Sequence, residues 1–206
     1  MFADRADAGE QLAAALRERG VEADVVLAIP RGGLPIGRPV ADALGVPLDV
    51  VVAKKIGAPN NPELAVAAVA DDGTLWRNES IIGSYDLTDG YLESAREREQ
   101  VAAREKFDRY RGDRPPLDLT GKRVVIVDDG LATGATMRAC VQRVQAADPR
   151  AIVVAVPVGS PDTVTAIGRS VDDVVALEEP ASFGAVGQFY RDFSQVSDED
   201  AMAYLA

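Results

Sequence analysis

The chain has 206 residues, 47% of them hydrophobic and 27% charged, which suits one α/β domain with a sizeable core. Its net charge of −11 and isoelectric point of about 4.5 argue against a nucleic-acid backbone as the main partner. It contains no histidine, which excludes His-dependent triads and His-ligated metals. Any proton transfer must therefore use Asp, Glu, Lys, Tyr or solvent.

We expect a cytoplasmic protein with no membrane span and no disulfide. No apolar run approaches the ~20 residues that a membrane helix needs, and the first ten residues are too polar for a signal peptide. The single Cys140 has no intrachain partner and falls among apolar residues of a predicted helix. It is expected to be a small buried thiol rather than a catalytic one.

Apolar periodicity in the first quarter of the chain predicts two helices alternating with two buried strands: residues 4–19, 23–30, 34–45 and 48–57, in that order. The second strand runs into Lys54 and Lys55 and then into a breaker-rich loop, APNNPE. Residues 65–82 predict a hairpin that turns at Asp71-Asp72-Gly73. We interpret this acidic pair as turn chemistry rather than as a site.

The rest of the chain continues the alternation, with predicted helices at 88–112, 134–148 and 161–168, strands at 122–129, 151–158 and 171–179, and a linker at 114–121. The alternating charges of helix 88–112 predict a solvated face and not a binding surface. The tail after residue 179 concentrates aromatic residues and ends in a short helix.

Continuous apolar strands that alternate with helices predict an α/β fold: a doubly wound, mainly parallel five-stranded sheet with flanking helices. We expect a single domain over residues 1–206, with its core at about 20–178. Ligands of such sheets bind beyond the carboxyl ends of the strands. Three predicted strand ends carry polar or charged groups there: Pro30-Arg31-Gly32-Gly33, Lys54-Lys55 and Asp128-Asp129.

The segment GLATGAT, residues 130–136, has the composition of an anion-binding loop at the start of a helix. Unpaired backbone N–H groups attract anions there, and small residues let a phosphate approach them. An ordinary helix cap by Thr133 is the alternative. The segment lacks the lysine of a P-loop, and neither it nor RGGLPIG has dinucleotide-fold glycine spacing.

The adjacent carboxylates Asp128 and Asp129 suit the two vicinal hydroxyls of a ribose. Charge-assisted hydrogen bonds to hydroxyls contribute roughly 1.5–3 kcal/mol each. A carboxylate and a phosphate ~6 Å apart repel by about 3 kcal/mol at an effective dielectric constant near 20, and Mg²⁺ would reverse that sign. A sugar with several phosphates, bound together with Mg²⁺, therefore fits better than a simple phosphate.

The stretch VVIVDDGLATGATM, residues 124–137, resembles the phosphoribosyl-pyrophosphate (PRPP) motif of the type I phosphoribosyltransferases. IPRGGLPIG resembles the pyrophosphate loop of that family, and KKIGAPNNPELAVAAVA resembles its mobile-loop region. GQFYRDFSQVSDED is similar to the tail of stand-alone, largely uncharacterised members. The resemblance covers most of the chain from about residue 25 to the end.

The resemblance implies that Asp128 and Asp129 bind the ribose hydroxyls and Mg²⁺, and that Arg31 and Lys55 act with them in catalysis. The implied PRPP-binding set adds the loop residues Gly130, Leu131, Ala132, Thr133, Gly134, Ala135 and Thr136. The implied pyrophosphate-binding set is Arg31, Gly32, Gly33, Lys54 and Lys55. The two lysines could instead be solvated residues at a strand end.

Four further expectations come with the resemblance. The pyrophosphate loop of the family often contains a cis peptide, for which Pro30-Arg31 is the candidate. A flexible loop at about 56–82 would close over the site, and a C-terminal hood at about 179–206 would cover a base held by Phe183 and Tyr190. These two aromatic residues could equally fill the end of the sheet. A homodimer is the usual form of the family.

The implied reaction is Mg²⁺-dependent transfer of ribose 5-phosphate from PRPP to a nitrogenous base, with release of pyrophosphate. Enzymes for 6-oxopurines carry an acid where this chain has Ala132, which disfavours hypoxanthine or guanine. A PRPP or nucleotide sensor on the same fold is the alternative. A sugar-phosphate phosphatase is disfavoured, because Asp128-Asp129-Gly130 lacks the D-x-D spacing.

Overall fold

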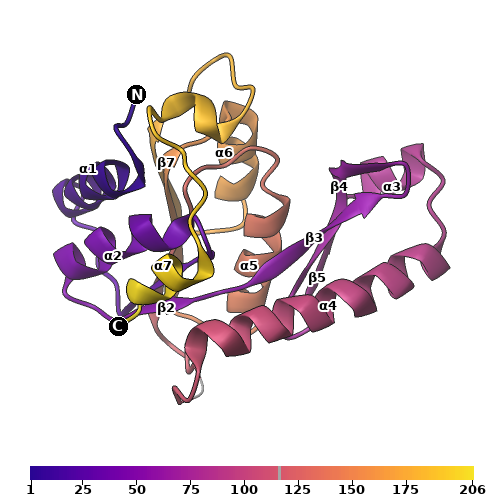
Figure 1. Ribbon diagram of the computed structural model, residues 1–206, viewed down its shortest axis with the longest axis horizontal. Coiled ribbons are helices and arrows are strands. Elements are labelled where there is room, and N and C mark those ends of the chain that lie inside the picture. Colours follow the sequence, from indigo (N-terminus) through magenta and orange to yellow (C-terminus); the bar gives the residue numbers. More distant parts are fainter. Residues whose placement is uncertain (116) are drawn as a thin grey trace.

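The computed structural model describes residues 1–115 and 117–206 as an α/β fold with two sheets (Figure 1). The main sheet has five parallel strands in the order β2-β1-β6-β7-β8. They are β1 (Val25–Ala28), β2 (Leu48–Val50), β6 (Arg123–Val127), β7 (Ala151–Val158) and β8 (Asp173–Glu178). The predicted five-stranded parallel sheet is confirmed, with each strand inside its predicted range.

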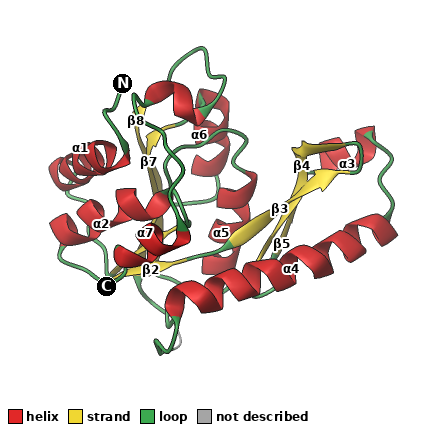
Figure 2. Cartoon of the chain, in the orientation of Figure 1, coloured by secondary structure: helices red, strands yellow, loops and turns green. Residues whose placement is uncertain are grey.

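Helices cover both faces of the main sheet, as Figure 2 shows in red against the yellow strands. The helices of one face are α1 (Arg5–Glu18) and α2 (Gly33–Leu44), and those of the other are α5 (Ala135–Gln145) and α6 (Pro161–Gly168). Each face has its own apolar cluster, because strands buried on both sides expose branched side chains alternately to the two helix layers. Cys140 is buried and free, as predicted.

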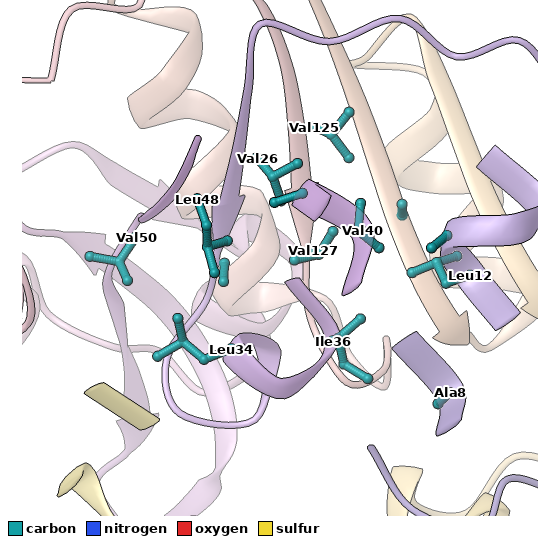
Figure 3. Close-up of a cluster of buried hydrophobic side chains, with 14 of the residues drawn as sticks. Ala8, Leu12, Val26, Leu34, Ile36, Val40, Leu48, Val50, Val125 and Val127 are labelled. Carbon is teal, nitrogen blue, oxygen red and sulfur yellow. The ribbon is translucent and has the colours of Figure 1, made fainter. Parts of the chain in front are cut away.

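The first cluster lies between the sheet and helices α1 and α2 (Figure 3). Val26 of β1 and Val127 of β6 are fully buried there, and so are Leu12, Ile36 and Val40 of the two helices. This packing fixes the start of α2 against the end of β1. The short connection between them, residues 29–32, is therefore held on a rigid support.

The second sheet is antiparallel and consists of β3 (Ala53–Ala58), β4 (Asn61–Ala70) and β5 (Leu75–Arg77), followed by the short α3 (Glu79–Ser84). The predicted turn at residues 71–73 is confirmed. Asp72 accepts a hydrogen bond from the N–H of Thr74 at 2.9 Å, whereas Asp71 is buried 3.4 Å from Arg143. Only one residue of the acidic pair therefore acts in the turn.

The prediction of one strand over 48–57 is wrong. The chain leaves the main sheet at Val51, whose N–H still bonds to Ala28, and β3 then joins the second sheet. Lys54 and Lys55 thus lie on an antiparallel strand and not at the end of a parallel one. The predicted loop APNNPE is also largely strand, because β3 and β4 pair up to Ala58 and Asn61.

The long helix α4 (Asp89–Arg111) runs alongside the second sheet and back to the main one (Figure 1). Thr88 caps its first turn at 3.2 Å. The expected solvated helix is only partly observed, because one face is buried by Leu92, Ala95, Ala103, Phe107, Tyr110 and Arg111. Arg111 makes a buried ion pair with Asp49 of β2 at 3.0 Å, which ties the end of α4 to the edge of the main sheet.

The tail contains a 3₁₀ turn, η1 (Val186–Phe189), and the short α7 (Asp198–Ala203). The first residues of the chain pair with it, since the N–H of Phe2 bonds to Phe189 and the N–H of Arg191 bonds to Phe2. Residue 116 of the predicted linker 114–121 lies outside the described residues. Among the residues that are described, no helix is long and apolar enough to cross a membrane.

We predict that Asp49→Ala lowers the free energy of unfolding by about 3–5 kcal/mol, because it leaves the buried guanidinium of Arg111 without its carboxylate. Asp108→Ala is the matched control, since it removes the exposed partner of Arg104 on the same helix. That loss is expected to be about 0.3–0.5 kcal/mol. Denaturant unfolding of both variants measures the difference, and equal losses would contradict the buried pair.

Candidate active site

Two predicted site segments meet at the carboxyl edge of the main sheet. Strands β1 and β6 are direct neighbours with Ala28 opposite Val127, so the loop after each strand emerges beside the other. Arg31 lies in the first loop and Asp128 follows the second strand. The Pro30–Arg31 peptide bond is cis, as the family resemblance implied.

Asp129 is held by a residue of the first helix. Its Oδ2 accepts a hydrogen bond from Nε of Arg5 at 2.8 Å, and the two side chains are only 16% and 12% exposed. The guanidinium of Arg5 also lies 3.8 Å from the ring centre of Phe193 and donates to the carbonyl oxygen of Ser194. Burial raises the pKa of the Asp129 carboxyl, and the bond to Arg5 opposes that shift.

Asp128 faces a different neighbourhood from Asp129. Its Oδ1 accepts the N–H of Asp129 at 2.9 Å, and its side chain lines a cavity of about 170 Å³ together with Lys55 and the loop 130–136. Burial and the negative charge of Asp129 raise the pKa of Asp128 well above its ordinary value. A nearby cation would relieve this unfavourable burial of negative charge.

The loop of residues 130–136 has the geometry of an anion-binding loop. Within the described part of the chain, the backbone N–H groups of residues 132–137 donate no hydrogen bond to the protein. The carbonyl oxygen of Ala132 accepts bonds from the hydroxyls of Thr163 at 2.7 Å and Ser160 at 3.2 Å. These bonds hold the loop from behind while its N–H groups stay available to a ligand.

Gly134 is required at the turn into α5. Its φ of 73° lies in the left-handed region, and a Cβ there would come within 2.6 Å of Thr163. Ala135 and Ala139 of α5 pack against Ala65 and Ala68 of β4. The second sheet therefore rests on the same helix whose N-terminus forms the loop.

The two adjacent lysines line separate cavities. Successive side chains of a strand point to opposite faces, so Lys55 lines the cavity of the 130–136 loop and Lys54 lines a second one. The second cavity, of about 370 Å³, also contains Arg31, so the structure brings these two predicted pyrophosphate residues together.

Lys106 of α4 is a site residue that the sequence did not reveal. Its Nζ donates a hydrogen bond to the carbonyl oxygen of Pro30 at 2.7 Å, and it lines the second cavity. Burial, reinforced by the charges of Lys54 and Arg31, lowers the pKa of Lys106 to about 8. Its position in a helix of alternating charge gave no signal that would separate it from surface lysines.

The predicted base-binding residues differ in their surroundings. Tyr190 is buried against Phe2 and Phe193, and its hydroxyl donates to the carbonyl oxygen of Asp129 at 2.6 Å. This position favours the alternative in which Tyr190 fills the end of the sheet. Phe183 is half-buried and stacks on Phe189 with ring centres 5.4 Å apart.

Val186 is the tail residue that reaches the 130–136 loop. It lines the smaller cavity, and a Cβ on Gly130 would come within 2.6 Å of its Cγ1. The tail therefore packs directly on the loop. The sequence analysis missed this contact because valine carries no chemical signal of a site.

The donor set gives a partial fit to Mg²⁺. Asp128 offers the hard carboxylate oxygen that Mg²⁺ prefers, whereas the Asp129 carboxylate is bonded to Arg5. Within the described ranges 1–115 and 117–206, no group of three or more His, Cys, Asp or Glu residues could hold a metal ion. The chain thus supplies few of the ligands, and a phosphorylated ligand would have to bring the rest.

Comparison with known proteins agrees with this geometry. The chain belongs to the phosphoribosyl transferase domain family, whose sequence profile matches residues 3–194. A crystal structure of TT1426 from Thermus thermophilus is 46% identical and superposes with a TM-score of 0.84, covering 100% of this chain and 97% of that one. The fold is that of the type I phosphoribosyltransferases.

Two curated relatives come from Mycobacterium tuberculosis, strains CDC 1551 / Oshkosh and ATCC 25618 / H37Rv. Both carry the name "Putative phosphoribosyl transferase" and are 42% identical to this chain over 205 residues. The match covers 100% of this chain but 46% of each relative, so the chain spans about half the length of the curated relatives.

We predict that Gly32→Ala lowers the free energy of unfolding by about 1–3 kcal/mol, because the new methyl overpacks the site. Its Cβ would lie 2.0 Å from Oδ2 of Asp129, so either the Arg5–Asp129 bond or the loop must move. The φ of Gly32 is −61°, which alanine adopts freely, so the effect comes from the contact alone.

Gly90→Ala is the control for this variant, since no atom of the described residues beyond its own stretch of helix lies within 4 Å of its new Cβ. Denaturant unfolding should leave Gly90→Ala at or above wild-type stability. Equal stability of Gly32→Ala and wild type would show that Asp129 is not fixed against this loop.

Proposed function

We propose that this domain is a Mg²⁺-dependent phosphoribosyltransferase that transfers ribose 5-phosphate from PRPP to a nitrogenous base with release of pyrophosphate. The observation that carries the proposal is the convergence of two anion sites on one carboxylate. Asp128 lines the cavity of the 130–136 loop, and the Arg31 loop emerges from the neighbouring strand. PRPP has this composition: one phosphate, a ribose and a pyrophosphate.

Each segment has a distinct task in binding. The free N–H groups of residues 132–137 and the hydroxyls of Thr133 and Thr136 bind the 5-phosphate. Asp128 accepts hydrogen bonds from the ribose hydroxyls and is the residue that would hold Mg²⁺. Arg31 and Lys54 bind the pyrophosphate from the second cavity. When bound, the metal offsets the repulsion between carboxylate and phosphates.

Catalysis in this proposal depends on positioning and on charge. Breaking the bond between C1 of the ribose and the pyrophosphate oxygen leaves negative charge on the leaving group, which Arg31 and Lys54 stabilise. Lys55 lies on the other face of β3 and supplies positive charge at the 5-phosphate side. In this proposal the second sheet, which packs on α5, excludes water from the reacting sugar.

The choice of base is limited by residue 132. Ala132 is exposed at the edge of the cavity and offers no group for proton transfer to a 6-oxopurine. Its carbonyl oxygen accepts hydrogen bonds from Thr163 and Ser160, and its side chain has no polar group. We propose an acceptor other than hypoxanthine or guanine, bound beneath the tail near Val186 and Phe183.

We predict that Asp128→Asn weakens Mg²⁺-dependent PRPP binding at least about tenfold, because the amide loses the charge that a metal and hydroxyls use. Asp173→Asn is the matched control: Asp173 also accepts the N–H of the next residue, but it lies exposed at the start of β8. Titration calorimetry with and without Mg²⁺ measures the effect. Unchanged binding in Asp128→Asn would remove the site assignment.

A second experiment separates an enzyme from a PRPP sensor. We predict pyrophosphate release when PRPP, Mg²⁺ and a panel of nucleobases are incubated with the protein, with hypoxanthine and guanine inactive. The Asp128→Asn protein is the negative control. Tight PRPP binding without pyrophosphate release from any base would contradict the enzyme and support the sensor.

A further inference from the structure

The second cavity concentrates positive charge in a strongly acidic protein. Its lining contains the cationic side chains of Arg31, Lys54, Lys106 and Arg109, against the carboxylates of Glu105 and Asp198. The whole chain has a net charge of −11 and only four lysines, two of which line this cavity. Such a local excess attracts anions.

Helix α4 contributes half of these cations. Lys106 and Arg109 both lie in its last two turns, while Arg31 and Lys54 come from the β1–α2 loop and from β3. An ammonium has three N–H donors, and within the described residues the protein uses only the one that binds Pro30. Lys106 is therefore able to bind a ligand while it holds the Arg31 loop.

The carboxylate of Asp198 already lies close to two of these positively charged side chains. Its Oδ2 lies 2.9 Å from Nη1 of Arg109, and its Oδ1 accepts the hydroxyl of Tyr110 at 2.6 Å and lies 3.9 Å from Nη1 of Arg31. The hydrogen bond from Tyr110, together with the positive charges of Arg31 and Arg109, lowers the pKa of Asp198, so it is ionised at neutral pH. It is the first residue of α7, in the C-terminal tail.

We propose that Lys106 and Arg109 are pyrophosphate-binding residues. In this proposal a bound pyrophosphate competes with the carboxylate of Asp198, in the C-terminal tail, for the positively charged side chains of the cavity. This inference rests on the proposed function, which makes pyrophosphate the leaving group at Arg31. It extends that function by adding α4 to the site and by coupling the tail to ligand binding. A charge-assisted bond from Arg109 to the ligand would replace the one that Arg109 makes to Asp198.

The first test measures binding of inorganic pyrophosphate without Mg²⁺ by titration calorimetry. We expect Lys106→Met and Arg109→Met each to weaken binding about tenfold or more, because each removes a charge-assisted donor. Among the hydrogen bonds of the described residues, Arg109 makes none to the backbone of the Arg31 loop, whereas Lys106 does, so Arg109→Met removes a cation without removing that support. Ribose 5-phosphate should bind both variants as it binds wild type.

Lys122→Met is the matched control, since Lys122 precedes β6 and lies at the opposite end of that strand from Asp128. It removes the same charge from the protein, so it corrects for any general effect of net charge. Pyrophosphate affinity of this variant should equal that of wild type. Thermal unfolding of all variants establishes that the fold is retained.

The second test predicts an increase in pyrophosphate affinity instead of a decrease. Asp198→Asn keeps an oxygen that can accept the hydrogen bond of Tyr110 but removes the competing charge, so pyrophosphate should bind more tightly than to wild type, by about threefold or more. A merely structural role of Asp198 would leave the affinity equal or lower. An equal or lower affinity would therefore contradict the proposed competition between Asp198 and pyrophosphate.

The results distinguish this inference from the proposed function. If Lys106→Met and Arg109→Met bind pyrophosphate with wild-type affinity, the inference is overturned. If the same variants still bind PRPP, the proposed function is unaffected. If wild type binds neither pyrophosphate, ribose 5-phosphate nor PRPP, the proposed function fails. If pyrophosphate binds and depends on Lys106 while PRPP does not bind, the anion site stands without the transferase.

Discussion

The partly buried ion pair between Arg5 and Asp129 connects four parts of the molecule. Arg5 belongs to the first turn of α1, Asp129 follows β6, and the guanidinium also contacts Phe193 and Ser194 of the tail. The Asp129 carboxylate lies so close to Gly32 that no Cβ fits between them. Because removing either charge would leave the other buried without a partner, these segments are constrained to one arrangement.

This constraint gives the two adjacent aspartates, Asp128 and Asp129, different roles. Asp129 is engaged by the protein itself through its carboxylate and, through its carbonyl oxygen, by Tyr190. Asp128 remains at the cavity, where its raised pKa reflects burial and the charge of its neighbour. A ligand or metal that supplies positive charge or hydrogen-bond donors is favoured at Asp128. The adjacent residue keeps the loops in position around it.

Much of the site could be predicted because its signals are local in sequence. The acidic pair, the small residues of 130–136 and the glycines after Pro30 each follow a strand recognisable by its branched apolar residues. Neighbouring parallel strands then bring their carboxyl ends together. The fold class follows from the same alternation of strands and helices.

The rest depends on contacts between distant segments. No glycine or proline marks the point at Val51 where the chain changes sheets, so the lysines were assigned to the wrong kind of strand. Lys106, Arg109 and Asp198 are ordinary charged residues in sequence, and they become site residues only because α4 and α7 return to the Arg31 loop. Arg5 lies 124 positions from its partner. Such pairs leave no trace in local periodicity.

The change of sheet at Val51 has a consequence for how charge is distributed between the two cavities. Lys54 and Lys55 are consecutive on β3, so the pleat of a single strand assigns one ammonium to each cavity. Pairing with β4 places Lys54 opposite Val69 and Lys55 opposite Ala68, and irregularities begin only after Ile56. A slip of one residue would exchange the faces of both lysines. The register of this hairpin is thus a determinant of which anion each lysine meets.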